Sequence, residues 1–354
     1  MRARHPGPYT LMMEIVRCTS ADAARWDDFV ARSDGGSFYQ LFSWKAINEQ
    51  CFGHETFYLA GLDGDALRGV FPLVLLRSRI FGRILCSMPF VNLGGPCAPE
   101  PQVLGALLDE SRAVLERTRA RFLEIRAREK LGDDIAVSVH KVSMTVALHE
   151  DPDAIWKAFT SKHRNNIRRA YGHGFTTVRG GAELLDACYD ILLESWRSLG
   201  TPLYAKSYFR AILDAFGPAV SIFLVLHNGK PVGTAFNGHH RTTVEGMWAG
   251  TSTAFRGSDC NYVLYWEMIK HYCEAGFERF HLGRSTVDSG AEAFKKKWLA
   301  EGTQLYWHHI PGSGRDIPQL NKENPKFRLA IQAWRRLPIA VTRRVGPMIA
   351  RGIP

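Results

Sequence analysis

The segment AVSIFLVLHNGKPVGTAFNGHHRTTVEGMWAGT, residues 219–251, contains three largely apolar or β-branched runs, each of strand length. The sequence Asn-Gly-Lys at 228–230 separates the first two runs, and Asn-Gly between such runs is typical of a tight β-hairpin. The segment therefore predicts an antiparallel meander of three strands, at 219–227, 231–240 and 242–251.

Helical patterns surround this meander. Two precede it, at 184–200 and 206–217, and a third follows at 262–277, after the loop STAFRGSDCN. A further strand is predicted at 279–285, where the sequence reads RFHLGRS. The second half of the chain thus reads as helices, a meander, a loop, a helix and a strand.

The first half of the chain has the same order of predicted elements. It predicts helices near 20–32 and 43–51, strands at 55–62, 66–78 and 84–91, a Gly/Pro-rich loop, a helix at 102–120 and a strand at 121–127. We therefore predict an α/β fold of two tandem modules, each with a central, mostly antiparallel sheet flanked by helices. The modules would span 1–150 and 151–313, and 314–354 would form a basic C-terminal extension.

Composition limits the class of protein. Of 354 residues, 45% are apolar and 23% charged, as in globular domains. No apolar run approaches the roughly 18 to 20 residues that span a bilayer, and the N-terminal MRARHPGPYT lacks a secretory apolar core. The seven cysteines form no CxxC pair and no zinc-like cluster, which predicts reduced thiols and no metal site. We expect a cytoplasmic protein.

The formal net charge of +10 is unevenly spread. Residues 161–179 carry five Lys or Arg and no acid, and the tail after Glu323 carries seven and no acid. Such blocks indicate anionic partners: phosphates, a nucleic acid or a membrane surface. A solvated basic face is the alternative.

The element order of each half is the layout of the GCN5-related N-acetyltransferase (GNAT) fold. There, the loop after the meander and the next helix N-terminus receive the phosphates of an acyl donor, because free N–H groups and the helix dipole favour an anion. A common α+β pattern with no such site is the alternative.

Several motifs resemble the Fem-like branch of that superfamily. SKHRNNIRRAYGHGFTT, from residue 161, resembles its RRNIRRAxxxG helix, and FHLGRSTVDSGAEAFKKKW, from residue 280, resembles its FDFGRS…FKKxWG stretch. NYVLYWEMIKH and ENPKFRLAIQAWRRLP look most similar to the FemAB-related proteins of exosortase/PEP-CTERM and exopolysaccharide gene clusters. The resemblance covers roughly residues 37 to 345.

This resemblance implies transfer of an acyl or aminoacyl group from a polyanionic carrier to an amine or hydroxyl acceptor in envelope or exopolysaccharide synthesis. The carrier would be acyl-CoA, acyl-carrier protein or aminoacyl-tRNA, with no metal. The chain lacks the helical-hairpin arm of some Fem enzymes, and FRGSDCN only partly matches a Q/R-x-x-G-x-G/A pyrophosphate loop. The donor therefore stays open.

The resemblance places Lys295 and Lys296 where the family has a lysine after an aromatic residue. A lysine can bind a phosphate, a carboxylate or a developing oxyanion. We predict a catalytic Lys295 and a donor-binding Lys296, with the triple charge facing a cleft and Phe294 and Trp298 anchoring the helix. Lys297 is predicted to be solvated, and a wholly exposed lysine face is the alternative.

Two short motifs supply further donor-binding candidates. In HLGRS, Gly283 permits close backbone approach and Arg284 can bind a phosphate or carboxylate, or the pair is a simple strand-end turn. In GSDCNY, Asn261 and Tyr262 begin the helix after the donor loop. Asn261 has the alternative role of N-cap, for which Asp259 competes.

The helix expected within 161–179 carries Arg164 and Arg168 on one face and Arg169 on a neighbouring one. A helix so rich in cations would repel itself unless an anion or the other module lies opposite. We predict that these arginines contact the donor or substrate, and solvation is the alternative.

No general base stands out. Glu245, on the third predicted strand of the second meander, is the candidate, with His239 and His240 as weaker ones and a relayed proton transfer as another. A G-x-S-x-G elbow is absent, which disfavours a covalent serine mechanism.

The tail RLPIAVTRRVGPMIARGIP, residues 336–354, mixes paired arginines with apolar residues. It predicts either peripheral contact with the inner face of a membrane, where a lipid-linked glycan acceptor would lie, or a packed extension. The rival functions are an RNA-binding protein and a non-catalytic scaffold of envelope assembly.

Overall fold

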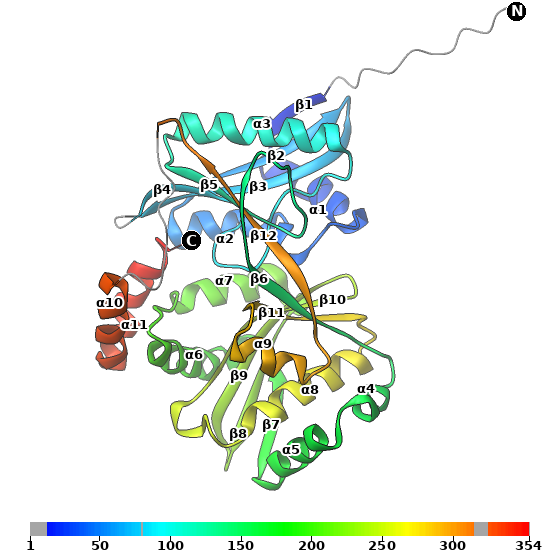
Figure 1. Cartoon of the computed structure of the whole chain (residues 1–354), viewed down its shortest axis with the longest axis vertical. Coiled ribbons are helices and arrows are strands. Elements are labelled where there is room, and N and C mark those ends of the chain that lie inside the picture. The colour runs from blue at the N-terminus through cyan, green and yellow to red at the C-terminus, as the bar shows by residue number, and fades with distance from the viewer. Residues whose placement is uncertain (1–12, 79–80, 315–324, 354) are drawn as a thin grey trace, which may run out of the picture.

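The computed structural model describes residues 13–78, 81–314 and 325–353 (Figure 1). Two lobes lie along the long axis of the molecule, and one sheet runs through both (Figure 1). Its twelve strands lie in the order β1-β2-β3-β4-β5-β12-β6-β11-β10-β9-β8-β7. The first half of the chain therefore forms one end of the sheet and the second half the other.

The strands have the following bounds: β1 Met13–Arg17, β2 Glu55–Asp63, β3 Ala66–Ser78, β4 Gly82–Cys86, β5 Phe122–Ala127, β6 Ala136–Ala147, β7 Phe175–Gly180, β8 Val220–His227, β9 Lys230–His240, β10 Thr243–Thr251, β11 Arg279–Thr286 and β12 Glu301–Pro311. The α-helices are α1 Ala23–Arg32, α2 Ser43–Phe52, α3 Pro101–Thr118, α4 Pro152–Ala158, α5 Ser161–Gly172, α6 Leu185–Leu199, α7 Lys206–Phe216, α8 Cys260–Glu274, α9 Gly290–Lys296, α10 Pro325–Arg336 and α11 Ile339–Ala350.

The predicted meander of the second half is confirmed as β8, β9 and β10, which pair antiparallel. Its first turn places Asn228 and Gly229 at φ 52° and 73°, the left-handed region that an Asn-Gly hairpin uses. The predicted strand at 84–91 was wrong beyond Cys86. Met88 and Phe90 have φ values of 46° and 72°, which no extended strand accommodates, so the chain turns there.

Two strands that the repeat did not predict join the lobes. β6 leaves the first half and pairs with β11, whereas β12 returns from the second half and lies between β5 and β6. In Figure 1 these two long strands cross the waist of the molecule. The module boundary near residue 150 stays a prediction, because it follows β6 within a sheet that both halves share.

A common core also fixes the halves against each other. α2 of the first half packs on α7 of the second, with the rings of Trp44 and Phe216 5.2 Å apart and those of Phe52 and Tyr208 4.8 Å apart. One buried cluster accordingly draws on residues of both halves. Residues of both halves can therefore contribute to one site at this interface.

Candidate functional site

The parallel strands β10 and β11 separate in the middle of the second lobe. They pair only over Thr243–Glu245 and Arg279–His281, although β10 continues to Thr251 and β11 to Thr286. A bulge between Gly246 and Trp248 accompanies the separation. Bulges redirect a strand and leave ladder groups unpaired, so a gap opens through the sheet.

A cavity of about 310 Å³, which we call the splay cavity, occupies this gap. Its lining is drawn from β9, β10 and β11, from α6, α8 and α9, from the segment between α6 and α7, and from the first half: Phe90, Asn92, Trp196, Tyr204, Ala235, Asn237, Gly246, Met247, Trp248, Ala249, Tyr265, Met268, Phe280, Leu282, Gly283, Arg284 and Lys295. Three predicted site residues therefore meet here: Gly283, Arg284 and Lys295.

Lys295 is held at the wall of the cavity. Its side chain is buried, and Nζ donates to the carbonyl oxygens of Gly283 and Arg284, both at 3.0 Å. Because an ammonium group has three N–H donors, one is left for the cavity. Burial, and next the charge of Arg284, lower the pKa of Lys295 to about 8.

Gly283 makes this arrangement possible. Its φ is 78°, and a Cβ there would lie 3.1 Å from the carbonyl oxygen of Gly246 and 3.8 Å from Nζ of Lys295. A side chain would be strained by the backbone and crowded by β10. The glycine thus lets β11 bulge against β6 between His281 and Arg284.

Arg284 is a packed cation beside the cavity, and no carboxylate within the described residues pairs with it. Its guanidinium lies 5.1 Å from the ring centre of Trp307, and Nη1 is 3.5 Å from the carbonyl oxygen of Val91. Burial, and next the charge of Arg126, lower the pKa of Arg284 to about 10. A cation held in this way favours an anionic ligand.

The other two lysines of the triplet do not line the cavity. Lys296 is exposed and pairs with Glu292 at 2.7 Å, and Lys297 is exposed. The expectation that the triple charge faces a cleft is therefore wrong for Lys296, whereas Lys297 is exposed as predicted. The side chain of Lys295 points inward from the short helix α9, next to fully buried Trp298 and half-buried Phe294.

Asn261 and Tyr262 lie in the first turn of α8 and do not line the splay cavity. Asn261 is not the N-cap: that position is Asp259, at φ 64°, and its side chain makes no capping bond. Oδ1 of Asn261 accepts from Thr251 at 2.7 Å, and the hydroxyl of Tyr262 accepts from Asn166 at 3.2 Å. Both contacts fasten the start of α8.

The arginines of α5 bind neighbouring protein groups. Arg164 donates to the carbonyl of Lys157 at 3.1 Å, Arg168 to Asn165 at 3.1 Å, and Arg169 pairs with Asp259 at 2.6 Å. The expected repulsion is thus partly relieved by these acceptors, and none of the three lines the splay cavity. Their donor-binding role stays a prediction, with Arg169 nearest to the start of α8.

Glu245 is buried on β10, directly before the gap. Oε1 lies 2.7 Å from Nδ1 of His281 and 3.9 Å from Nη2 of Arg128. Burial lowers the pKa of both His239 and His240, which makes these rings neutral. The pairing of Glu245 with His281 was missed by the sequence interpretation, because it depends on β10 and β11 being neighbours.

Sequence comparison identifies a domain in the second half: residues 158–296 match the acetyltransferase (GNAT) domain. A comparison with curated proteins found no match. Among the described residues, no group of three His, Cys, Asp or Glu is placed to hold a metal ion.

Solved structures agree on the fold. The crystal structure of FemX is 15% identical, covers 83% of this chain and 96% of its own, and gives a TM-score of 0.64. The tandem GNAT protein of the clavulanic acid biosynthesis pathway is 12% identical, with 86% and 100% covered and a TM-score of 0.54. L-PGS from Bacillus licheniformis is 14% identical, with 89% and 98% covered and a TM-score of 0.54.

The predicted tandem GNAT-like fold is thereby confirmed. The second half of the chain thus matches a GNAT-type acetyltransferase domain, and the chain as a whole shares the fold of FemX and the tandem GNAT protein.

Proposed function

We propose that the chain transfers an acyl or aminoacyl group from a polyanionic carrier to an amine or hydroxyl acceptor in cell-envelope or exopolysaccharide synthesis. The carrier is acyl-CoA, acyl-carrier protein or aminoacyl-tRNA. The observation that carries the proposal is the splay cavity, where Lys295 and Arg284 bring two packed cations to a gap in the sheet. We infer that the donor carbonyl enters this gap.

The two cations suit the charge that acyl transfer creates. Attack on the carbonyl produces an oxyanion, and preorganised donors stabilise it without reorganisation. The third N–H of Lys295 is such a donor, because its other two are fixed on carbonyls 3.0 Å away. Arg284 would bind an anionic part of the donor or acceptor.

The size of the cavity limits what it holds. A volume of about 310 Å³ is at the lower end of small-molecule sites. It therefore accommodates the acyl end of a carrier, and the polyanionic remainder would lie outside it, towards the first turn of α8, where Arg169 lies.

A panel of donors tests the proposal. Acyl-CoAs, acyl-carrier proteins and charged tRNAs are compared by thermal shift, since a ligand of the native state raises Tm. We expect Lys295→Ala to lose transfer by at least a hundredfold and keep the fold, whereas the control Lys296→Ala, at an exposed lysine, retains it. Full transfer by Lys295→Ala, or no donor that raises Tm, would refute the proposal.

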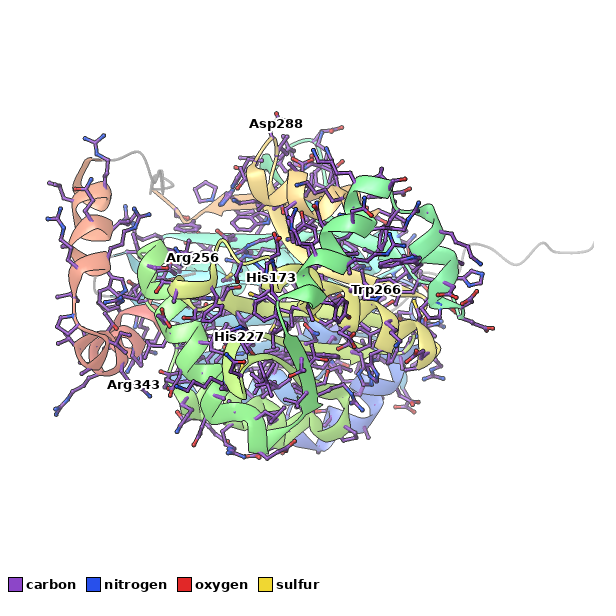
Figure 2. All side chains as sticks on the ribbon, turned by 90° about the horizontal axis from the view of Figure 1, so that it is seen from below. His173, His227, Arg256, Trp266, Asp288 and Arg343 are labelled. Carbon is purple, nitrogen blue, oxygen red and sulfur yellow. The ribbon has the colours of Figure 1, made fainter. Side chains whose placement is uncertain are left out.

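We also propose peripheral membrane contact through α10 and α11, which would bring the enzyme to a lipid-linked acceptor. The helices pack on α6 and project from one edge of the molecule, where Figure 2 labels Arg343. Beside its buried residues Thr342 and Gly346, α11 exposes Val341, Val345 and Met348. No helix of the described residues is long and apolar enough to cross a bilayer.

Vesicle sedimentation tests this contact. We expect binding to vesicles with anionic lipid, and a loss of about tenfold or more in Arg336→Glu/Arg344→Glu, since each cation near such a surface contributes about 1 kcal/mol. Lys230→Glu, at the exposed start of β9, is the charge control. Equal binding to neutral vesicles, or by the double variant, would exclude the electrostatic contact.

A further inference from the structure

A row of polar residues crosses four strands beside the splay cavity. The register aligns Glu245 on β10 with His281 on β11, His281 with Thr145 on β6, and Thr145 with Glu301 on β12. Residues aligned across strands project from the same face of a sheet. This row therefore lies on one face, beginning at the point where β10 and β11 part.

A depression of about 350 Å³ lies over this row. We call it the polar trough, and its polar lining is Arg128, Ser143, Thr145, Arg279, His281, Glu301 and Thr303. A smaller hollow of about 90 Å³ lies on the Glu245 side and shares Arg128, Arg279 and His281 with the trough. His281 thus stands between the two, and neither cavity has been given a role so far.

The contact between Glu245 and His281 leaves one ring nitrogen free. Oε1 of Glu245 holds Nδ1 of His281 at 2.7 Å, with side-chain exposures of 4% and 12%. A carboxylate on Nδ1 fixes the tautomer in which Nε2 carries the lone pair. Within the described residues, no protein group hydrogen-bonds Nε2 of His281, so it is available to a molecule in the trough.

We propose that the polar trough receives the acceptor and that His281, positioned by Glu245, takes the proton of its nucleophile. The inference rests on the proposed acyl transfer. The acceptor nitrogen or oxygen bonds to the acyl carbon, and its proton passes to Nε2. The bond from the acyl carbon to the carrier heteroatom then breaks, and that heteroatom takes the proton from the imidazolium.

The geometry puts the base next to the donor. Glu245 and His281 are followed directly by Gly246 and Leu282, both of which line the splay cavity. Donor and acceptor would therefore meet where the two strands part, with Lys295 at the oxyanion and His281 at the nucleophile. In this arrangement Glu245, predicted as the base, is a positioning residue.

Charge on the rim indicates the class of acceptor. Arg241 and Arg279 line the smaller hollow, and among the described residues neither guanidinium has an ion-pair partner. Arg128 has only the long 3.9 Å contact with Glu245. Besides Glu245, two acidic residues line these hollows: Asp34 in the smaller one and Glu301 in the trough. Three weakly paired guanidinium groups favour an acceptor that carries a phosphate or carboxylate.

Ligand titration followed by NMR tests the trough without any knowledge of the donor. The full chain, with ¹⁵N-labelled histidine, is titrated with glycerol 1-phosphate, with acetate and with glycerol. We expect a saturable shift of the His281 ring with one of the two anions and none with glycerol, and at least tenfold weaker binding in Arg241→Ala/Arg279→Ala. The more effective anion distinguishes phosphate from carboxylate. No shift, or equal binding by the double variant, would overturn the site.

Variants of the dyad test the proton step. We expect His281→Gln to lower kcat at least a hundredfold and to remove the acid limb of the pH profile, with the donor-induced rise in Tm unchanged. Glu245→Gln should lower kcat less and shift that limb. Arg128, Arg279 and Glu301 also face the ring and are kept constant.

The two hypotheses fail in different ways. A wild-type rate and pH profile in His281→Gln would overturn the assigned base and leave the donor site intact. A wild-type chain to which no donor binds would overturn the proposed transfer, whereas the NMR titration would still decide whether the trough binds anions.

Discussion

The two halves of the molecule use the same strand arrangement in different ways. In the first half, β4 pairs parallel with β5 at Leu85–Cys86 and Leu123–Glu124, as β10 pairs with β11 in the second. In the second half both strands continue past the pairing and the splay cavity opens between them. In the first half, β4 ends at Cys86 and the chain turns, and the backbone N–H groups of Gly94 and Gly95 donate to the carbonyl oxygen of Arg126 on β5.

Buried side chains fill the corresponding position of the first half. Arg126 pairs with Glu124 at 2.7 Å, donates to the carbonyl oxygen of Val91 at 2.8 Å and lies 4.7 Å from the ring centre of Trp307. Burial raises the pKa of Glu124, but Arg126 and His309 outweigh it and bring the value to about 2. Here the cation has its own carboxylate, whereas Arg284 does not.

The comparison shows that the same arrangement of parallel strands can be filled by buried side chains in one half and can form a cavity in the other. In the first half the cation Arg126 is paired, whereas in the second half Arg284, which contacts the same Trp307 ring system, has no carboxylate partner among the described residues. The halves differ in two features. β4 ends at Cys86, whereas β10 continues past its pairing with β11, and Arg126 has a carboxylate partner, whereas Arg284 has none among the described residues.

The largest expected effect on stability comes from removing Arg126, the cation that is paired in the first half. Arg126→Ala leaves the carboxylate of Glu124 buried without its partner, which should cost about 3 to 5 kcal/mol of unfolding free energy. Arg284→Ala removes a cation with no such partner and should cost at least about 2 kcal/mol less. Chemical denaturation of both variants measures the difference.

A rescue sharpens that result. Arg126→Met combined with Glu124→Gln removes both buried charges and should recover most of the lost stability. Equal losses in Arg126→Ala and Arg284→Ala would mean that the two halves do not differ in the way described.

The second prediction concerns the alkaline pH dependence of stability. The pKa of Lys295 falls from 10.5 to about 8 on folding. Between pH 8 and 10.5 the unfolded chain therefore binds more protons, so this lysine makes stability rise with pH, by up to about 3 kcal/mol. Lys295→Met should abolish the rise and be more stable than wild type near pH 7. Denaturation curves from pH 7 to 10.5 measure it.

Lys296→Met is the matched control, because that lysine is exposed and paired with Glu292. It should leave the alkaline slope as in wild type. A wild-type slope in Lys295→Met would show that placing the Lys295 ammonium group at the splay cavity does not lower the free energy of unfolding.

The sequence supported the meanders, the tandem repeat and the lysine at residue 295, because these depend on local patterns. Asn228–Gly229 indicates a hairpin wherever it lies, and the residues after Phe294 belong to a motif with a family resemblance. The sequence did not indicate β6 and β12 as strands, since their pairing is set by partners more than 100 residues away. The pairing of Glu245 with His281 was hidden for the same reason: it exists only once β10 and β11 are neighbours.

The smallest expected effect isolates the glycine that lets β11 close on β10. Gly283→Ala places a Cβ at φ 78° and 3.1 Å from the carbonyl oxygen of Gly246, which should cost about 1 to 2 kcal/mol. Gly53→Ala is a control for backbone strain alone, because Gly53 has a left-handed φ of 66° and nothing lies within 4 Å of its Cβ. The excess loss in Gly283→Ala, measured by denaturation, is thus the cost of crowding between the two strands. Equal losses in the two variants would mean that β11 moves away from β10 to accommodate the added Cβ. The two strands would then not be tightly packed at Gly246 and Gly283.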